Sequence, residues 1–280
     1  MNKLAIKERL QLFLMEDIGE GDLTSQTVIA TGKRGQGNMV AKEAGVMAGG
    51  EIVRLGYQCV DEEVEVTIHV ADGEPFQAGD ILVSMKGSYL SLLAGERVLL
   101  NIFQRMCGIA TMARDAVLRL DDPSIRICDT RKTTPGLRIF EKYAVRCGGG
   151  FNHRFGLSDA ILLKENHLLA GGGITKTLQA VKEKVGHMVK VEVETTNEEE
   201  VLEAVEAGAD VIMFDNATPE EIASYVKLVP SVIKTEASGN ISLETIASYR
   251  GCGVDYLSLG CLTHSVKAKD ISFLLEAEGE

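Results

Sequence analysis

The segment "VKVEVETTNEEEVLEAVEAGADVIMFDN" (residues 189–216) combines two patterns that together decide the fold class. Two apolar runs, residues 189–195 and 209–216, flank a charged stretch. Thr195 and Thr196 precede that stretch, and threonine is a residue type that caps helices. Apolar runs bounded by loops are typical of strands buried on both faces. The segment therefore predicts a strand, a helix and a second strand, the repeating unit of a parallel sheet covered by helices.

The same pattern recurs from about residue 120 to residue 260. Strands are expected within "IRICDTRK" (125–132), "DAILLKENH" (159–167), "SVIKTEAS" (231–238) and "VDYLSLG" (254–260), in addition to the two runs above. These strands are apolar in their bodies and polar near their ends, at Arg131, Lys132, Lys164, Glu194, Asp215, Glu236 and Ser238, with Gly260 last. In a (β/α) barrel, the carboxyl ends of the strands form the mouth of the active site.

The length of this region limits the kind of barrel that it can form. An eight-fold barrel takes about 250 residues, and only about 150 are available here. We therefore expect an α/β fold with an open or incomplete (β/α) barrel over residues 111–267.

Residues 1–110 mix helices (about 3–16, 49–59 and 89–105) with strands (around 37–47, 64–70 and 81–86), which predicts an N-terminal α+β domain. Residues 268–280 are expected to return to it.

Composition excludes several classes of partner. The formal net charge of −12 argues against nucleic acid, whose phosphates require a broad basic face. No apolar run approaches the ~20 residues that span a bilayer, and the first residues read as an amphipathic helix. Without a CxxC pair, the six cysteines are expected to be reduced thiols. We expect a cytoplasmic protein without membrane contacts.

A basic region interrupts this acidic chain. Residues 126–167 contain eight Lys or Arg and four Asp or Glu, a local charge of +4. Such a region is either a solvated surface or a pocket for an anion. The turn-forming segments "TTPG" (133–136) and "CGGG" (147–150) favour the pocket, because glycine lets the backbone approach a ligand.

Individual residues in and near this region suggest chemistry but leave alternatives open. Arg131, Lys132 and Arg154 suit an oxyanion such as a carboxylate or phosphate. Lys164 could pair with Glu194 or Glu236, form a Schiff base, or bind phosphate. Among the histidines, the one beside Arg154 is the candidate for a role in the site.

Further candidates lie outside the basic region. Glu194 and Asp215 end neighbouring strands, where they could hold Mg²⁺ or serve as counter-ions. The loops "EASGNIS" (236–242) and "LGCLTHS" (259–265) occupy the usual phosphate position of a barrel. Arg97, taken alone, reads as a surface arginine that pairs with Glu96.

Taken together, these motifs resemble those of the quinolinate phosphoribosyltransferase family. The resemblance covers residues 16–272 and includes "EDIGEGDLTS", "GERVLLN", "DTRKTTPGLR", "EKYAVRCGGGFNHRFGLSDAILLKENH", "VEVET", "FDN", "EASGN" and "LTHS". It implies a reaction of quinolinate with phosphoribosyl pyrophosphate. The expected products are nicotinate mononucleotide, CO₂ and pyrophosphate, formed with Mg²⁺ in NAD biosynthesis.

The resemblance also assigns roles to residues. It implies that the quinolinate carboxylates are bound by Arg131, His153, Arg154 and Lys164. Arg97 is expected to reach the partner's site in a homodimer. Phosphoribosyl pyrophosphate is expected near Lys132 and Lys164, with Glu194 and Asp215 holding it through Mg²⁺, and these four are the expected catalytic residues. Thr130 is a further expected substrate-binding residue. Its 5′-phosphate is expected at Ser238, Gly239, Asn240, Leu259, Gly260 and Cys261.

Three other functions compete with this assignment. A related protein encoded with molybdate-transport genes departs from the family around "TTPGLR" and "KENH", which are both intact here. An aldolase or lyase would use Lys164 as a Schiff base, which borohydride trapping would detect. A sugar-phosphate-binding protein without catalytic activity is the third.

Overall fold

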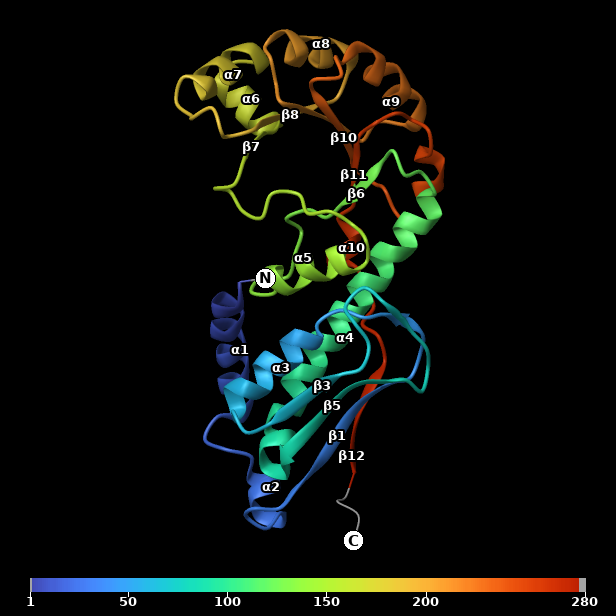
Figure 1. Ribbon diagram of the computed structural model, residues 1–280. Helices are drawn as coiled ribbons and strands as arrows, with labels where there is room; N and C mark the ends of the chain where they lie inside the picture. The colour runs from blue at the N-terminus through green and yellow to red at the C-terminus, as the bar shows by residue number, and fades with distance from the viewer. Residues whose placement is uncertain (1, 277–280) are drawn as a thin grey trace. The chain divides into compact units, whose positions relative to one another are not determined.

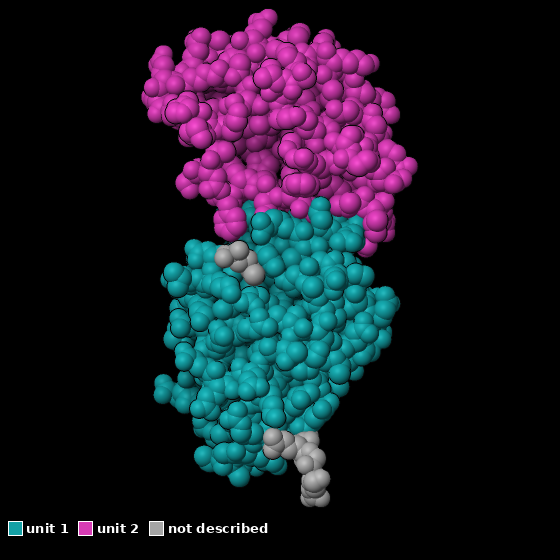
Figure 2. All heavy atoms as spheres, viewed as in Figure 1, with its two compact units in different colours: residues 1–114, 133–149, 265–280 teal, residues 115–132, 150–264 magenta. Residues whose placement is uncertain are grey.

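The computed structural model describes residues 2–276, which form two compact units (Figures 1 and 2). Among these residues, unit 1 contains 2–114, 133–149 and 265–276, and unit 2 contains 115–132 and 150–264. Residues 133–149, expected in the second domain, thus group with unit 1. The expected boundary near residue 110 stays a prediction.

Unit 1 is built on a four-stranded antiparallel sheet. Its order is β12-β1-β5-β3, with β1 at Arg34–Ala41, β3 at Glu65–Ile68, β5 at Ile81–Ser88 and β12 at Ile271–Glu276. A small ladder joins β2 (Gly45–Val46) to β4 (Pro75–Phe76). Because β12 pairs with β1, the chain returns to the first sheet as expected. Residues 277–280 of the returning segment lie outside the described residues.

Most helices of unit 1 bury apolar side chains, such as Ile6, Val53 and Phe140. The helices of this unit are α1 (Lys3–Ile18), α2 (Leu23–Val28), α3 (Gly50–Val60), α5 (Arg138–Cys147) and the first part of α4 (Tyr89–Leu120). The α4 helix was expected to end near residue 105. It continues because Ile109, Ala113 and Leu120 extend its buried side.

Gly148 explains why the segment after "TTPG" groups with unit 1. A Cβ on Gly148 would lie 2.3 Å from the carbonyl oxygen of Ala110 in α4. The Arg114 side chain also donates from Nε to the Gly148 carbonyl. The glycine therefore permits close approach of α5 to α4, whereas the sequence suggested that it lets the backbone approach a ligand.

Unit 2 contains a six-stranded parallel sheet. Its order is β6-β11-β10-β9-β8-β7, with β6 at Arg126–Cys128, β7 at Ile161–Leu163, β8 at Val191–Thr195, β9 at Val211–Asp215, β10 at Lys234–Ser238 and β11 at Tyr256–Ser258. Each of the six expected segments contains one of these strands. Within residues 2–276, no ladder joins β6 to β7. The expected α/β fold with an open barrel of fewer than eight strands is therefore confirmed.

Helices connect these strands and cover the sheet. They are α6 (Glu165–Gly171), α7 (Ile174–Lys182), α8 (Glu198–Glu206), α9 (Pro219–Tyr225) and α10 (Cys261–His264), with 3₁₀ turns η1 (Val226–Leu228) and η2 (Ile246–Tyr249). Figure 1 shows β7 to β10 as an arc, with α6 to α9 on its outer side. Strand residues such as Val193, Ile212 and Leu257 are fully buried.

Threonines precede both α8 and α9, and only α9 is capped by one. The Thr218 side chain caps α9 and forms a capping box with Glu221, as the Thr-Pro pair predicts. In α8 the cap is Asn197, whose side chain accepts from the Glu200 N–H. Thr195, an expected cap, is buried and instead donates to the Met213 carbonyl. No helix within residues 2–276 has the length and apolar character needed to cross a membrane.

Candidate active site

A cavity of about 400 Å³ in unit 2 brings together most of the expected site residues. Four cationic side chains line it: Arg131, Lys132, Arg154 and Lys164. Three carboxylates line it as well: Glu194, Asp215 and Glu236. Five more of the expected residues line it: Thr130, His153, Ser238, Gly239 and Asn240. The residues come from the strand ends and following loops, where a parallel sheet directs its polar termini to one edge.

Arg131 and Arg154 lie near each other in the cavity, and their positive charges repel. Burial lowers the pKa of Arg154, and the nearby Arg131 guanidinium lowers it further. Arg154 Nη1 donates to the Ala160 carbonyl at 3.0 Å. Its buried Nε has no hydrogen-bond partner among residues 2–276. Two guanidinium groups that repel each other favour the binding of an anion, because its negative charge would offset their repulsion.

Lys164 and Glu194 form an ion pair at the ends of β7 and β8. The register pairs Leu163 with Val193, so the residues that follow them meet across the two strands. The Lys164 side chain is about half exposed (48%), whereas that of Glu194 is 14% exposed. Of the alternatives for Lys164, the structure therefore shows the salt bridge with Glu194.

His153, which lines the cavity, forms a cluster with two buried carboxylates. His153 Nε2 lies 3.1 Å from Glu192 Oε2 and 3.5 Å from Glu236 Oε1. Burial, together with the nearby Glu192, raises the pKa of Glu236 to about 7. Sequence reasoning missed Glu192. The alternation in "VEVE" could have found it, because it places Glu192 and Glu194 on the same side of β8.

The loop after β10 requires glycine. Gly239 has a φ of +97°, and a Cβ there would lie 2.2 Å from Asn216 Oδ1. Asn240 Nδ2 donates to that same oxygen at 3.0 Å. Asn216 also lines the cavity and was not among the expected site residues. The loop thus packs its backbone directly against the end of β9.

The second expected phosphate loop lies near the cavity without lining it. Leu259 is fully buried, and Gly260 and Cys261 are absent from the lining residues. A Cβ on Gly260 would approach Lys132 Cδ to 3.0 Å. The loop therefore packs against a lysine that does line the cavity, and its phosphate role stays a prediction.

Several cations of the basic region lie elsewhere. Arg138, Lys142 and Arg146 are in α5 and belong to unit 1. Arg126 stacks over the rings of Phe151 and Tyr256, at 4.9 and 5.9 Å from their centroids. The local charge of +4 is therefore divided between the cavity and these other positions.

Arg97 lies in α4 of unit 1 and does not line the cavity of unit 2. Its side chain is 60% exposed, and Nη2 lies 3.6 Å from Glu96 Oε1. This is the surface pair that the sequence suggested for the isolated chain.

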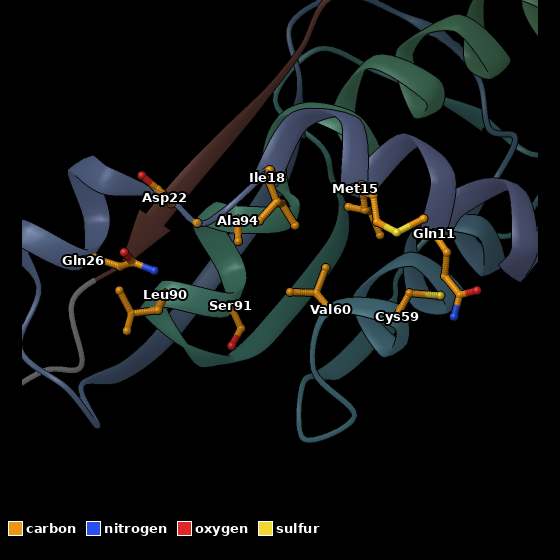
Figure 3. Close-up of a pocket in the computed structure, with 13 residues that line it drawn as sticks. Gln11, Met15, Ile18, Asp22, Gln26, Cys59, Val60, Leu90, Ser91 and Ala94 are labelled. Atoms are coloured by element: carbon orange, nitrogen blue, oxygen red, sulfur yellow. The ribbon is translucent and has the colours of Figure 1, made fainter.

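Two other cavities contain fewer of the expected residues. Figure 3 shows one of about 570 Å³ in unit 1, between α1, α3 and α4, where apolar side chains such as Met15, Ile18 and Val60 predominate. Another, of about 670 Å³ in unit 2, shares only Glu194 and Asp215 with the expected set. The cavity with the four cations is therefore the candidate active site.

The fold and the site define a class of protein: an α/β barrel-like protein with a cavity at the carboxyl ends of its strands that four cationic side chains line. Two family models match the chain: "Quinolinate phosphoribosyl transferase, N-terminal domain" over residues 22–107 and "Quinolinate phosphoribosyl transferase, C-terminal domain" over residues 109–274. The chain therefore belongs to the quinolinate phosphoribosyltransferase family, a family of phosphoribosyl-transferring enzymes.

Individual relatives agree with this family. A "Probable nicotinate-nucleotide pyrophosphorylase [carboxylating]" of Bacillus subtilis is 52% identical over 97% of this chain and 94% of its own length. A mitochondrial "Quinolinate phosphoribosyltransferase [decarboxylating] 2" of Nicotiana glauca is 38% identical over 98% of this chain and 83% of its own. The crystal structure of NadC from Streptococcus pyogenes has a TM-score of 0.95 and 40% identity, covering 100% of this chain and 99% of that one.

Proposed function

We propose that this protein transfers the phosphoribosyl group of phosphoribosyl pyrophosphate to quinolinate, with loss of CO₂. The products are nicotinate mononucleotide, CO₂ and pyrophosphate, and the reaction is a step of NAD biosynthesis. The names of the relatives support the reaction. The structural observation that carries it is the convergence of Arg131, Lys132, Arg154 and Lys164 on one cavity of an otherwise acidic chain.

The four cations would offset the repulsion between the two anionic substrates of this reaction. Quinolinate carries two carboxylates and its co-substrate carries several phosphate charges. Two like charges ~4 Å apart repel by ~4 kcal/mol at an effective dielectric constant near 20. Arg131 and Arg154 offer forked donors for the carboxylates, and Lys132 and Lys164 offer point charges. We assign quinolinate to the arginine side of the cavity, with His153 beside it.

The carboxylates of Glu194 and Asp215 fit a role in holding Mg²⁺. They end neighbouring strands and line the cavity together. Within residues 2–276, neither belongs to a cluster of three or more potential metal ligands. A site with two carboxylates leaves the remaining positions to water and substrate phosphate oxygens, which is the usual way in which Mg²⁺ is bound. When bound, Mg²⁺ would offset the charge of the departing pyrophosphate.

The side chains of the cavity have separate tasks in the reaction. The bond from ribose C1′ to pyrophosphate breaks as the pyridine nitrogen bonds to C1′, through a transition state of oxocarbenium character. Lys132 and Lys164 stabilise the negative charge that develops on the leaving group. The ring then loses its 2-carboxylate as CO₂, the electron pair stays on the ring carbon, and a proton replaces the carboxylate. The arginines hold the remaining carboxylate, and the loop of Ser238, Gly239 and Asn240 receives the 5′-phosphate.

A homodimer completes this proposal. Arg97 would enter the partner's site, consistent with its exposed position on α4. Mg²⁺ dependence, the dimer and the cytoplasmic location are parts of the proposal that rest on the family resemblance.

Release of CO₂ tests the proposed reaction directly. The purified protein should release CO₂ from quinolinate only when phosphoribosyl pyrophosphate is present, and chelation of divalent cations should stop the reaction. Borohydride should not inactivate the protein in the presence of quinolinate, because this transfer forms no imine at Lys164. CO₂ release without the co-substrate, or covalent trapping at Lys164, would contradict the proposal.

A further inference from the structure

The ring of His153 lies between two buried carboxylates that have no role in the reaction described above. Glu192 belongs to β8 and Glu236 to β10, and their side chains are 9% and 6% exposed. Glu192 Oε1 is buried and has no hydrogen-bond partner among residues 2–276. Buried carboxylates are costly, and well-packed apolar residues are often at least as stable in such positions. The pair therefore calls for an explanation other than the stability of the core.

The hydrogen bonds of His153 fix which ring nitrogen carries the proton. The backbone N–H of Arg154 donates to His153 Nδ1 at 2.8 Å. A neutral imidazole that accepts at Nδ1 carries its hydrogen on Nε2. That N–H therefore points toward Glu192 Oε2 and Glu236 Oε1.

The same assignment decides against a metal at this cluster. His153, Glu192 and Glu236 offer three ligand atoms that all lie within 4.8 Å of one another. A metal would bind the histidine through an unprotonated Nε2, and the hydrogen would then move to Nδ1. Nδ1 already faces the N–H of Arg154, so two donors would oppose each other. We therefore interpret the cluster as a set of hydrogen bonds that supports the His153 ring.

Two further hydrogen bonds connect this cluster to β6 and β11. The backbone N–H of His153 donates to Asp129 Oδ1 at 2.9 Å, directly after β6. The Ser258 hydroxyl of β11 donates to Glu236. Asp129, Ser258, Glu192 and Glu236 are all buried. The loop that carries Arg154 is thus fixed through His153 from four strands of the sheet.

We propose that Glu192 and Glu236 are positioning residues that orient the His153 ring and, through its Nδ1, the Arg154 backbone at the anion site. The proposal rests on the proposed function insofar as the anion is quinolinate. The two carboxylates act through His153 and need not contact the substrate.

A positioning role and a purely electrostatic role of the two glutamates predict opposite changes in quinolinate affinity. Replacing both glutamates with leucine removes two potential negative charges beside an anion site, which by Coulomb attraction alone would strengthen quinolinate binding. If the glutamates position the loop, the Glu192→Leu/Glu236→Leu variant should instead raise the dissociation constant about ten-fold. Glu236→Gln keeps an acceptor oxygen for His153 and Ser258, and should rescue binding to within about three-fold of the wild type.

Imidazole ¹⁵N spectroscopy provides a readout that a merely structural role would not move. The chain has five histidines, and His153→Gln would identify the signal of His153. The wild type should show His153 with its proton on Nε2, and the double leucine variant should show a mixture of tautomers. The Glu236→Gln signal should resemble that of the wild type. Glu206→Leu, on the exposed side of α8, is the control for the same chemical change away from the cluster.

The outcomes separate this proposal from the proposed function. If the wild-type protein fails to bind quinolinate, the proposed function fails, and the tautomer measurement still tests the cluster. Should the double variant not fold, the Glu192→Leu and Glu236→Leu single variants take its place, each with a smaller expected loss. Undiminished quinolinate binding in the leucine variants, or a wild-type His153 protonated on Nδ1, would overturn the proposal.

Discussion

Lys164, at the end of β7, and Glu194, in β8, neutralise each other at the mouth of the cavity. Each also has a proposed partner in the reaction: an anionic substrate for Lys164, and a metal-bound substrate for Glu194. The ion pair and these two interactions compete for the same charged groups. An anion that attracts Lys164 therefore leaves Glu194 available, and the two substrates are expected to favour each other's binding.

The first prediction concerns this competition. Glu194→Gln should tighten quinolinate binding about two- to five-fold in the absence of divalent cations, because Lys164 loses its partner. Asp215→Asn removes a negative charge from the same cavity but leaves the Lys164–Glu194 pair intact, and should change the affinity less. Calorimetric titration with quinolinate measures both variants. Equal tightening would mean that the net charge of the cavity, and not the ion pair, controls affinity.

The second prediction concerns the loop after β10. Gly239→Ala places a Cβ against Asn216 Oδ1 at a φ of +97°, and should raise the KM for phosphoribosyl pyrophosphate. Gly79→Ala is a matched control, because Gly79 has a φ of +95° and no atom within 4 Å of the added Cβ. Both variants should lose about 1 kcal/mol of stability from backbone strain, and Gly239→Ala should lose more because its Cβ also meets Asn216. Steady-state kinetics should show a KM change in the first variant alone.

The third prediction concerns the dependence of stability on pH. Burial raises the pKa of Glu236 from its ordinary 4.5 to about 7. Between these values the folded state keeps a proton that the unfolded state has lost, so this group's contribution to the free energy of unfolding falls as pH rises. The limiting slope is roughly 1.4 kcal/mol per pH unit. Glu236→Gln should remove this dependence, and the variant should gain stability relative to the wild type between pH 5 and pH 7.

Denaturant unfolding at several pH values measures that difference. Glu206→Gln, on the surface of α8, controls for loss of one carboxylate. A wild-type and a Glu236→Gln protein whose stabilities stay parallel from pH 5 to pH 7 would show that Glu236 titrates normally.

The fourth prediction concerns the proposed exchange of Arg97 between subunits. Arg97→Ala and Arg154→Ala should each lose most activity when prepared alone. Mixed dimers contain one site with both arginines intact, so reassociation of the two inactive proteins should restore about a quarter of the wild-type rate. Either variant remixed with itself is the control. If mixing restores nothing although mixed dimers form, Arg97 does not act across the interface.

The polar ends of the expected strands account for most of the candidate site. Lys164, Glu194 and Asp215 end three successive strands in the chain, and all three line one cavity. The prediction succeeds because parallel strands direct their carboxyl ends to the same edge of a sheet. The strands could be recognised because their apolar bodies are short, buried and bounded by loops.

The polar strand ends do not predict which side chains pair with each other in the cavity. The pairing of Lys164 with Glu194 depends on the register of β7 and β8, and the sequence left Glu236 equally open. The contacts of His153 with Glu192 and Glu236 join three segments that are far apart in the chain. Such contacts depend on strand order, which local patterns do not encode.

Local patterns in the sequence are enough to predict the α/β class, the open parallel barrel and the concentration of cations at its strand ends, because each follows from periodicity and from the ordering of polar residues. The three-dimensional arrangement is needed to show that residues 133–149 pack with unit 1, where Gly148 allows α5 to approach α4, and that His153 lies between two buried glutamates. Those features depend on which side chains meet across long stretches of chain, and close packing selects one such arrangement from the many that the local patterns permit.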